Sequence, residues 1–250
     1  MNQVLIRPEE TGSQGEVRLS GRRAAHLLHV LRVQSGDSIR VGMLGGGRGR
    51  ADVLGTDGET VAVRCYFDCP ALCPTGITVL LALPRPKVVR RLFAPLAASG
   101  VEKVFFTNAA KVERVYFDTH WLLPEQYEPL LMEGLEQSGE TRLPEIRVVR
   151  RLKPLVEDEL SQWGGTRLVL HPGPGALPAV GVRMVAPVLL AIGPEGGWTD
   201  YEVDLFRAHG FTCVTLGARI LRSDMAVHAM VGIVSSLLLQ ERENEKPAIS

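Results

Sequence analysis

The spacing of hydrophobic residues along the chain changes near residue 75. Before this point, apolar and polar residues alternate over short stretches such as 17–19, 51–54 and 60–67, as expected for half-buried strands separated by turns. Residues 22–31 instead carry leucines at helical spacing. The first part of the chain is therefore predicted to be a small β-barrel with one helix.

After residue 75, continuous apolar runs alternate with segments of helical spacing. Residues 77–83 read ITVLLAL, a run typical of a strand that is buried on both faces. Thr199 and Glu202 form a capping box at the start of a helix. The alternation predicts a mostly parallel α/β sheet covered on both faces, with a domain boundary after residue 72. Further strands are predicted at 101–107, 145–149, 167–171, 185–192 and 212–216, and helices at 88–98, 125–138, 199–209 and 224–243.

Composition supports a folded protein that lies outside the membrane. Hydrophobic residues make up 45% of the 250 and charged residues 22%, which excludes global disorder. The longest helix-compatible apolar stretch, 226–239, is interrupted by polar residues and is shorter than the roughly 20 residues that cross a bilayer. The first residues do not resemble a secretion signal. We therefore expect no membrane span and a cytoplasmic location.

Charge is balanced overall but segregated locally. Lys and Arg total 28, as do Asp and Glu, so the formal net charge is zero. Residues 85–91 and 147–153 each hold four basic residues and no acid. Such clusters can form a local nucleic-acid face on a neutral protein, or they can be ordinary solvated surface.

The four cysteines predict no metal site. Cys65, Cys69 and Cys73 are spaced four apart, which falls within the range of zinc ligands. A fourth ligand is not evident nearby, and Cys213 lies in a predicted buried strand. Reduced cytosolic thiols are the preferred interpretation.

Two glycine-bearing segments directly follow predicted strands. One reads AIGPEGGW at 191–198 and the other LGARILR at 216–222. Loops at the carboxyl ends of parallel strands are where α/β sheets bind ligands, and glycine lets the backbone approach a ligand closely. Either segment alone could be only a tight turn. Dinucleotide, P-loop, Gly-x-Ser-x-Gly and His-Glu-x-x-His signatures are incomplete or absent, which disfavours hydride transfer, nucleotide hydrolysis and metalloprotease chemistry.

The same segments resemble a known family. IGPEGGWTDYE and the later LGARILRSDMA resemble the ribosomal RNA small subunit methyltransferase E family, which belongs to the SPOUT class of S-adenosylmethionine-dependent RNA methyltransferases. HLLHVLRVQSGDSIRV and EQSGETRLPEI resemble its N-terminal and central segments. The resemblance implies a PUA-like β-barrel for RNA at residues 1–72 and a SPOUT α/β domain with a trefoil knot at 73–250. It also implies a homodimer that uses S-adenosylmethionine to methylate N3 of a uridine in 16S rRNA of the small ribosomal subunit.

The resemblance indicates the donor loops, and charge and position suggest candidates for the other roles. The catalytic candidates are Arg219, Arg222 and Asp224, with an arginine stabilising the uracil anion or the RNA backbone; Asp224 and His228 are candidates for the proton acceptor by position only. The expected cofactor-binding residues are Leu170, His171, Pro172, Ile192, Gly193, Pro194, Glu195, Gly196, Gly197, Leu216, Gly217, Ile220 and Leu221. The expected phosphate contacts, which could equally serve solubility, are Arg7, Arg22, Arg32, Arg85, Lys87, Arg90 and Arg91.

The chain departs from the family pattern at three places, and at one of them residues 96–100 lack the Glu that is common before the family's Gly-Val. Where the family usually reads Arg-Thr-Glu-Thr-Ala, this chain has RSDMA, so a hydroxyl is lost at Met225. Glu140 replaces an arginine and reverses a charge that could face RNA. Two other functions therefore stay open: a SPOUT enzyme for another RNA, and a non-catalytic RNA-binding factor for ribosome assembly.

Overall fold

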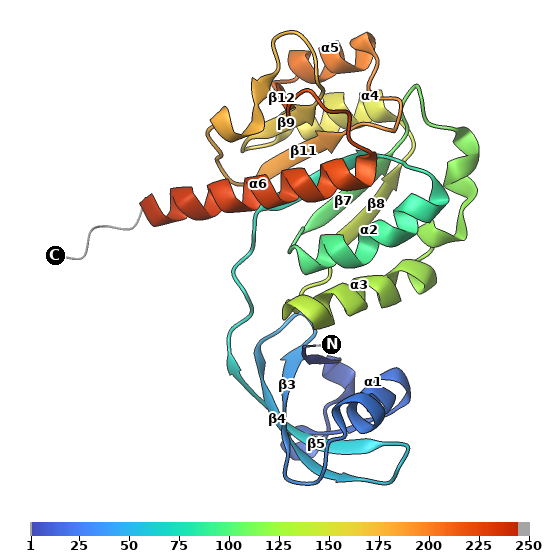
Figure 1. The fold of residues 1–250 in the computed structure, drawn as a ribbon, viewed down its shortest axis with the longest axis vertical. Helices are drawn as coiled ribbons and strands as arrows, with labels where there is room; N and C mark the ends of the chain where they lie inside the picture. Colours follow the sequence, from blue (N-terminus) through green and yellow to red (C-terminus); the bar gives the residue numbers. More distant parts are fainter. Residues whose placement is uncertain (1, 245–250) are drawn as a thin grey trace, which may run out of the picture. The chain divides into compact units, whose positions relative to one another are not determined.

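A computed structural model describes residues 2–244. These residues form two compact units (Figure 1). The first unit contains the chain up to Cys73 together with Leu131–Leu143, and the second contains Pro74–Leu130 and the chain from Pro144. Helix α3 (Pro124–Ser138) begins in the second unit and ends in the first.

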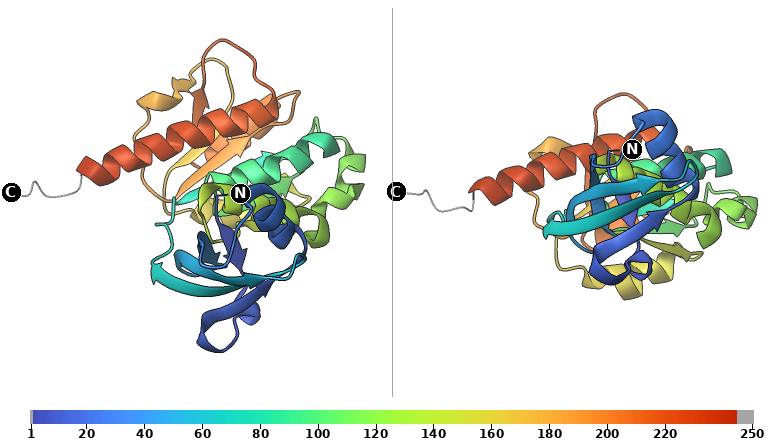
Figure 2. Two further views of the ribbon diagram at one scale, coloured as in Figure 1. Left: turned by 60° about the horizontal axis from the view of Figure 1, so that its bottom comes forward. Right: turned by 90° about the horizontal axis from the view of Figure 1, so that it is seen from below.

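The first unit is built on a curled sheet of five strands (Figure 2). Its order is β1-β3-β4-β5-β2, and all neighbours are antiparallel except β1 and β3. The strands are β1 (Val4–Ile6), β2 (Glu16–Leu19), β3 (Ser38–Met43), β4 (Arg48–Thr56) and β5 (Val61–Cys69). This PUA-like half-barrel matches the predicted fold class.

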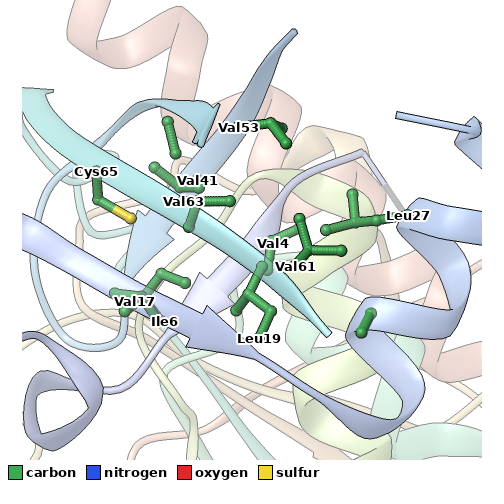
Figure 3. Close-up of a cluster of buried hydrophobic side chains, with 12 residues drawn as sticks. Val4, Ile6, Val17, Leu19, Leu27, Val41, Val53, Val61, Val63 and Cys65 are labelled. Carbon is green, nitrogen blue, oxygen red and sulfur yellow. The ribbon is translucent and has the colours of Figure 1, made fainter. Parts of the chain in front are cut away.

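Alternation along these strands produces the core of the first unit. Val17 and Leu19 are buried, whereas the intervening Arg18 is exposed. Figure 3 shows side chains from all five strands pointing into one cluster, which Leu27 joins from the helical side. The predicted helix consists of α1 (Gly21–Ala25) and a π-helical turn (His26–Leu31), which ends where Arg32 adopts a left-handed φ of 54°.

The segment Leu131–Leu143 is fastened to the first unit by hydrogen bonds. The backbone amides of Asn2 and Gln3 donate to the Glu136 carbonyl oxygen, and Thr141 Oγ1 donates to the Gly46 carbonyl oxygen at 2.7 Å. Glu140, which the sequence suggested could face RNA, is only 5% exposed. Its carboxylate accepts a hydrogen bond from the Thr141 amide at 2.8 Å, so this expectation is wrong. A local backbone donor replaces the water that a buried carboxylate would otherwise need.

The second unit is built on a parallel sheet, as predicted, and the sheet has seven strands, one more than the sequence indicated. Its order is β10-β12-β9-β11-β6-β7-β8. β11 (Val188–Ile192) and β6 (Ile77–Ala82) are buried at every position, which explains their continuous apolar runs. The remaining strands are β7 (Lys103–Thr107), β8 (Glu145–Val149), β9 (Arg167–Leu170), β10 (Leu177–Pro178) and β12 (Thr212–Thr215). Together with the half-barrel, this arrangement is the combination of a small β-domain and a parallel α/β sheet predicted from the sequence.

Helices α2 (Pro86–Ala98) and α6 (Ser223–Asn244) pack against each other, and α6 crosses β11 and β6 (Figure 1). α2 continues through Pro95, where the loss of one backbone hydrogen bond is offset by six buried apolar side chains. α5 (Asp200–Ala208) starts at the predicted capping box. Residues 152–162 form an irregular helical stretch, α4 (Leu152–Pro154) followed by π and 3-10 turns, that the pattern did not reveal.

Within residues 2–244, α6 is long and apolar enough to cross a membrane by length and composition alone. However, 39% of its most apolar window is buried inside the protein. Ala226, Met230 and Val234 lie on this buried face. The composition of α6 is therefore also that of a helix packed on a sheet.

Candidate active site

Three loops meet at one edge of the second unit's sheet. β12, β9 and β11 are neighbours and run parallel, so their carboxyl ends lie side by side. The loops that leave them begin at His171 after β9, Gly193 after β11 and Leu216 after β12. The second and third loops contain the two glycine-bearing segments. Sheet order, which periodicity cannot show, brings them together.

The loop after β11, residues 193–198, is anchored by neighbouring side chains. Trp198 is 3% exposed, and its ring meets Phe206 of α5 edge-on with centroids 4.9 Å apart. Ser223 Oγ donates to the Gly193 carbonyl oxygen at 3.1 Å, and Lys111 Nζ donates to the Gly196 carbonyl oxygen at 2.7 Å. A Cβ at Gly193 would lie 3.2 Å from the indole and the backbone nitrogen of Trp198, so a larger residue there would have to push Trp198 away by a few tenths of an ångström.

The loop after β12, residues 216–222, is far more open. Thr215 Oγ1 exchanges hydrogen bonds of 3.1 Å with the amide and the carbonyl oxygen of Gly217, whose φ is 102°. Beyond this turn, the Ile220 side chain is 90% exposed and Leu221 is 37% exposed. Large apolar side chains at such exposure gain little from burial in the folded chain, which is typical of a ligand-binding segment.

The three loops enclose a cavity of about 330 Å³. All thirteen residues expected to bind the cofactor line it, including Glu195 and Leu216 on different loops. Its surface is mostly apolar and includes exposed backbone of the glycines, as is common in sites for small organic ligands.

The lining also includes residues that the sequence did not single out: Lys111, Trp198, Thr215, Ser223 and Ala226. Lys111 lies in the segment after β7 and reaches the cavity through its hydrogen bond to Gly196, which is 85 residues away in the sequence. The indole Nε1 of Trp198 is buried and has no hydrogen-bond partner among the described residues. Trp198 directly follows the glycine-bearing segment, and this position in the sequence is the signal that could have placed it in the cavity.

A second, larger hollow adjoins this cavity. Glu195, Ile220 and Leu221 line both, so they form the boundary between the two. The remaining wall of the hollow contains the cations Arg85, Lys87 and Arg222, together with Pro86, Val88 and Tyr116. An anionic or polar ligand placed in the hollow would therefore lie beside the first cavity.

The three catalytic candidates are separated by the structure. Arg219 lines the first cavity and Arg222 the second hollow. Asp224 lines neither, and its carboxylate lies between Arg222 at 3.0 Å and Arg91 at 3.1 Å. In this geometry Asp224 is placed to orient Arg222.

The residues expected to contact phosphate lie in both units. Arg22 is paired with Glu136 in the first unit, where Arg7 is partly buried and Arg32 is exposed. In the second unit, Arg85 pairs with Glu195 at 3.0 Å, and the Arg90 guanidinium lies 5.1 Å from the centre of the Trp121 ring. Lys87 is exposed in the first turn of α2. Among residues 2–244 there is no group of three or more His, Cys, Asp or Glu side chains placed to hold a metal.

Comparisons with known proteins identify the family of this chain. Residues 72–235 match the family model for the RNA methyltransferase domain. The chain is 32% identical over 244 residues to the ribosomal RNA small subunit methyltransferase E of Treponema pallidum, covering 94% of this chain and 90% of that protein.

Solved structures share the fold. A probable rRNA-methyltransferase from Porphyromonas gingivalis superimposes with a TM-score of 0.77 at 23% identity, covering 96% of this chain and 100% of that one. A ribosomal RNA small subunit methyltransferase E from Neisseria gonorrhoeae, solved with bound S-adenosyl methionine, gives a TM-score of 0.72 at 20% identity, covering 94% and 98%. The chain belongs to the ribosomal RNA small subunit methyltransferase E family, and so to the RNA methyltransferases.

Proposed function

We propose that this protein uses S-adenosylmethionine to methylate N3 of a uridine in the 16S rRNA of the small ribosomal subunit. The observation that carries the proposal is the single cavity that the loops after β9, β11 and β12 line together. Family membership supports the reaction class, and the neisserial neighbour was solved with this methyl donor. We place the activity in the cytoplasm, where ribosomal RNA is found.

The residues of the cavity fit the methyl donor. Leu170, Ile192 and Ile220 supply apolar surface for the two faces of an adenine ring. Backbone groups of the glycine loops can pair with the ring's polar edge, and the unpartnered Trp198 Nε1 offers a donor to a ligand acceptor. Bound S-adenosylmethionine would supply an electrophilic methyl group on a sulfonium centre.

The protein's own contribution is to place the acceptor nitrogen and to stabilise its anion. Uracil N3 must lose its proton before it can accept a methyl group. Arg222 and Lys87 line the second hollow, where their charges favour the anionic base over the neutral one. Holding both reactants in adjoining sites replaces a bimolecular encounter with a positioned one.

We assign RNA binding to residues 1–72 and methyl transfer to residues 73–250. Arg7 and Arg32 in the first unit and Lys87 and Arg90 in the second are the proposed phosphate contacts. Each would raise RNA affinity with little dependence on sequence. Replacing one of them should weaken RNA binding and reduce its dependence on salt.

We further propose that the enzyme is a homodimer joined through α6. Its outward face carries exposed Met225, Ala229, Gly232 and Leu239 at helical spacing. A Cβ at Gly232 would meet nothing within 4 Å, so Gly232→Arg fits the isolated chain. Sedimentation velocity should show a dimer for wild type and a monomer for this variant. A wild-type monomer would contradict the assignment.

Two measurements test the function. Titration calorimetry with S-adenosylhomocysteine should show one site per chain. Modified uridines in 16S rRNA should be mapped in a strain that lacks the gene and in the same strain after the gene is returned. One N3-methyluridine should be lost in the first strain and restored in the second. An unchanged 16S pattern with a change in another RNA would indicate a different substrate. Donor binding with no lost modification would indicate a non-catalytic assembly factor.

A further inference from the structure

One phenol lines the second hollow. Tyr116 lies in a 3-10 helix, η4 (Arg114–Asp118), which follows β7. Its hydroxyl donates a hydrogen bond to Glu113 Oε1 at 2.6 Å. The hollow in turn shares Glu195, Ile220 and Leu221 with the donor cavity. A base bound there would thus lie between the methyl donor's site and a hydroxyl backed by a carboxylate.

The other carboxylates around the two cavities are occupied by cations. Glu195 pairs with Arg85 at 3.0 Å, and Asp224 lies between Arg91 and Arg222. Both of these carboxylates are therefore already engaged by guanidinium groups. Glu113 has no ionic partner among residues 2–244, and its recorded side-chain hydrogen bond comes from the neutral Tyr116. Glu113 is therefore the better placed proton acceptor.

We propose that Tyr116 and Glu113 form a relay that removes the N3 proton of the acceptor base. This inference rests on the proposed function and names the group that the sequence left unidentified. The N3 proton passes to Tyr116 Oη, while the phenolic proton passes to Glu113 Oε1. The electron pair stays on N3, which becomes the nucleophile, and Glu113 releases the proton to solvent because it is exposed.

The charges around the phenol are consistent with a relay. The hydrogen bond to Glu113 raises the pKa of Tyr116 above its usual value, and burial adds to this, while nearby Arg85 lowers it. The net shift is upward, so the phenol stays protonated and can pass a proton only by receiving another. Lys87 and Arg222 also line the second hollow. Their positive charges favour the anionic form of a uracil bound there.

Tyr116→Phe tests the relay because it removes the hydroxyl and keeps the ring. With small subunits from a deletion strain at pH 7, we expect kcat to fall by about 10²-fold or more, the range of general base catalysis. KM for the subunits and the dissociation constant of S-adenosylhomocysteine should stay within about twofold of wild type. Glu113→Gln should lower kcat in the same way, and the defect of both variants should shrink as pH rises and hydroxide removes the N3 proton.

Val115→Ala is the matched control, because Val115 lies in the same 3-10 helix and its side chain is 63% exposed. It should leave kcat, KM and stability unchanged. If Tyr116→Phe keeps wild-type kcat between pH 6 and 7, the relay is wrong. If Tyr116→Ala then raises KM while Tyr116→Phe does not, Tyr116 serves only as a surface on which the base stacks. If wild type neither binds S-adenosylhomocysteine nor methylates the subunit, the proposed function fails first and the relay with it.

Discussion

The loops after β11 and β12 line one cavity, but the protein holds them very differently. The loop after β11 is fixed by a buried tryptophan and by hydrogen bonds from Lys111 and Ser223. The loop after β12 leaves Ile220 90% exposed. One wall of the candidate donor site is therefore preorganised, whereas the other gains its main apolar contacts only when a ligand is present. Preorganisation lowers the entropic cost of binding, and an exposed apolar side chain adds affinity when it becomes buried.

The largest expected contrast is between Trp198→Ala and Ile220→Ala. Trp198→Ala removes a buried ring packed on Phe206, and we expect the second unit to lose about 3–5 kcal/mol of unfolding free energy. Ile220→Ala should change stability by less than about 0.5 kcal/mol but weaken binding of S-adenosylhomocysteine. Urea unfolding and calorimetry measure the two effects. Equal losses of stability would remove the distinction between the loops.

Ser223→Ala tests one fastening of the anchored loop. It removes the hydrogen bond to the Gly193 carbonyl oxygen at a position that is 4% exposed. We expect a loss of about 1 kcal/mol in unfolding free energy and a weaker binding of S-adenosylhomocysteine. Gly181→Ala is a suitable control, since a Cβ there meets nothing within 4 Å and Gly181 lines neither cavity. An unchanged affinity in Ser223→Ala would show that this bond does not shape the site.

Lys111→Met tests the other fastening and should have a smaller effect. Lys111 is exposed, so water can replace the hydrogen bond that its ammonium donates to Gly196. We expect S-adenosylhomocysteine to bind a few-fold more weakly, equivalent to less than about 1 kcal/mol. Arg114→Met changes a neighbouring exposed cation that lines neither cavity and should have no effect. Equal losses in both variants would point to general electrostatics.

The smallest effect concerns the first unit and its dependence on pH. Hydrogen bonding to Arg23 lowers the pKa of Glu10 below its usual 4.5. Its stabilising contribution is therefore fully present above pH 4.5 and is lost as pH falls through the lowered value. Because both side chains are partly exposed, we expect less than about 1 kcal/mol. Unfolding of Glu10→Gln should depend less on pH between 5 and 3 than unfolding of wild type does.

Sequence periodicity predicted most elements of both units, but it missed β1, β10 and the irregular helical stretch at 152–162. It also could not show the contacts between distant elements. The continuous apolar runs of β6 and β11 indicate that both faces of the sheet are covered there, and the capping box at Thr199 and Glu202 indicates where a helix begins. Neither signal says which strands are neighbours. The association of Leu131–Leu143 with the first unit depends on hydrogen bonds to Asn2, Gln3 and Gly46 that leave no local pattern.

The candidate site was predictable where the chain carries glycine-bearing motifs and unpredictable elsewhere. All thirteen residues expected at the cofactor line the cavity, because each lies at the end of a strand or in the loop that follows it. Lys111 and Tyr116 lie in an irregular segment after β7. Charged and aromatic residues in such a segment look like ordinary surface residues, so the sequence does not mark them as part of a site. The prediction that Glu140 could face RNA is wrong because a carboxylate is expected at the surface from the sequence, whereas the Thr141 amide donates a hydrogen bond to it inside the fold.

The proposed function depends most on the three loops forming one donor site. Hydrogen exchange of the full-length protein, with and without saturating S-adenosylhomocysteine, tests it directly. We predict protection in all three segments, 170–172, 193–198 and 216–221, with the largest gain at 216–221 because that loop is the least anchored. Protection confined to one of these segments, or none at 216–221, would show that the three loops do not form one donor site.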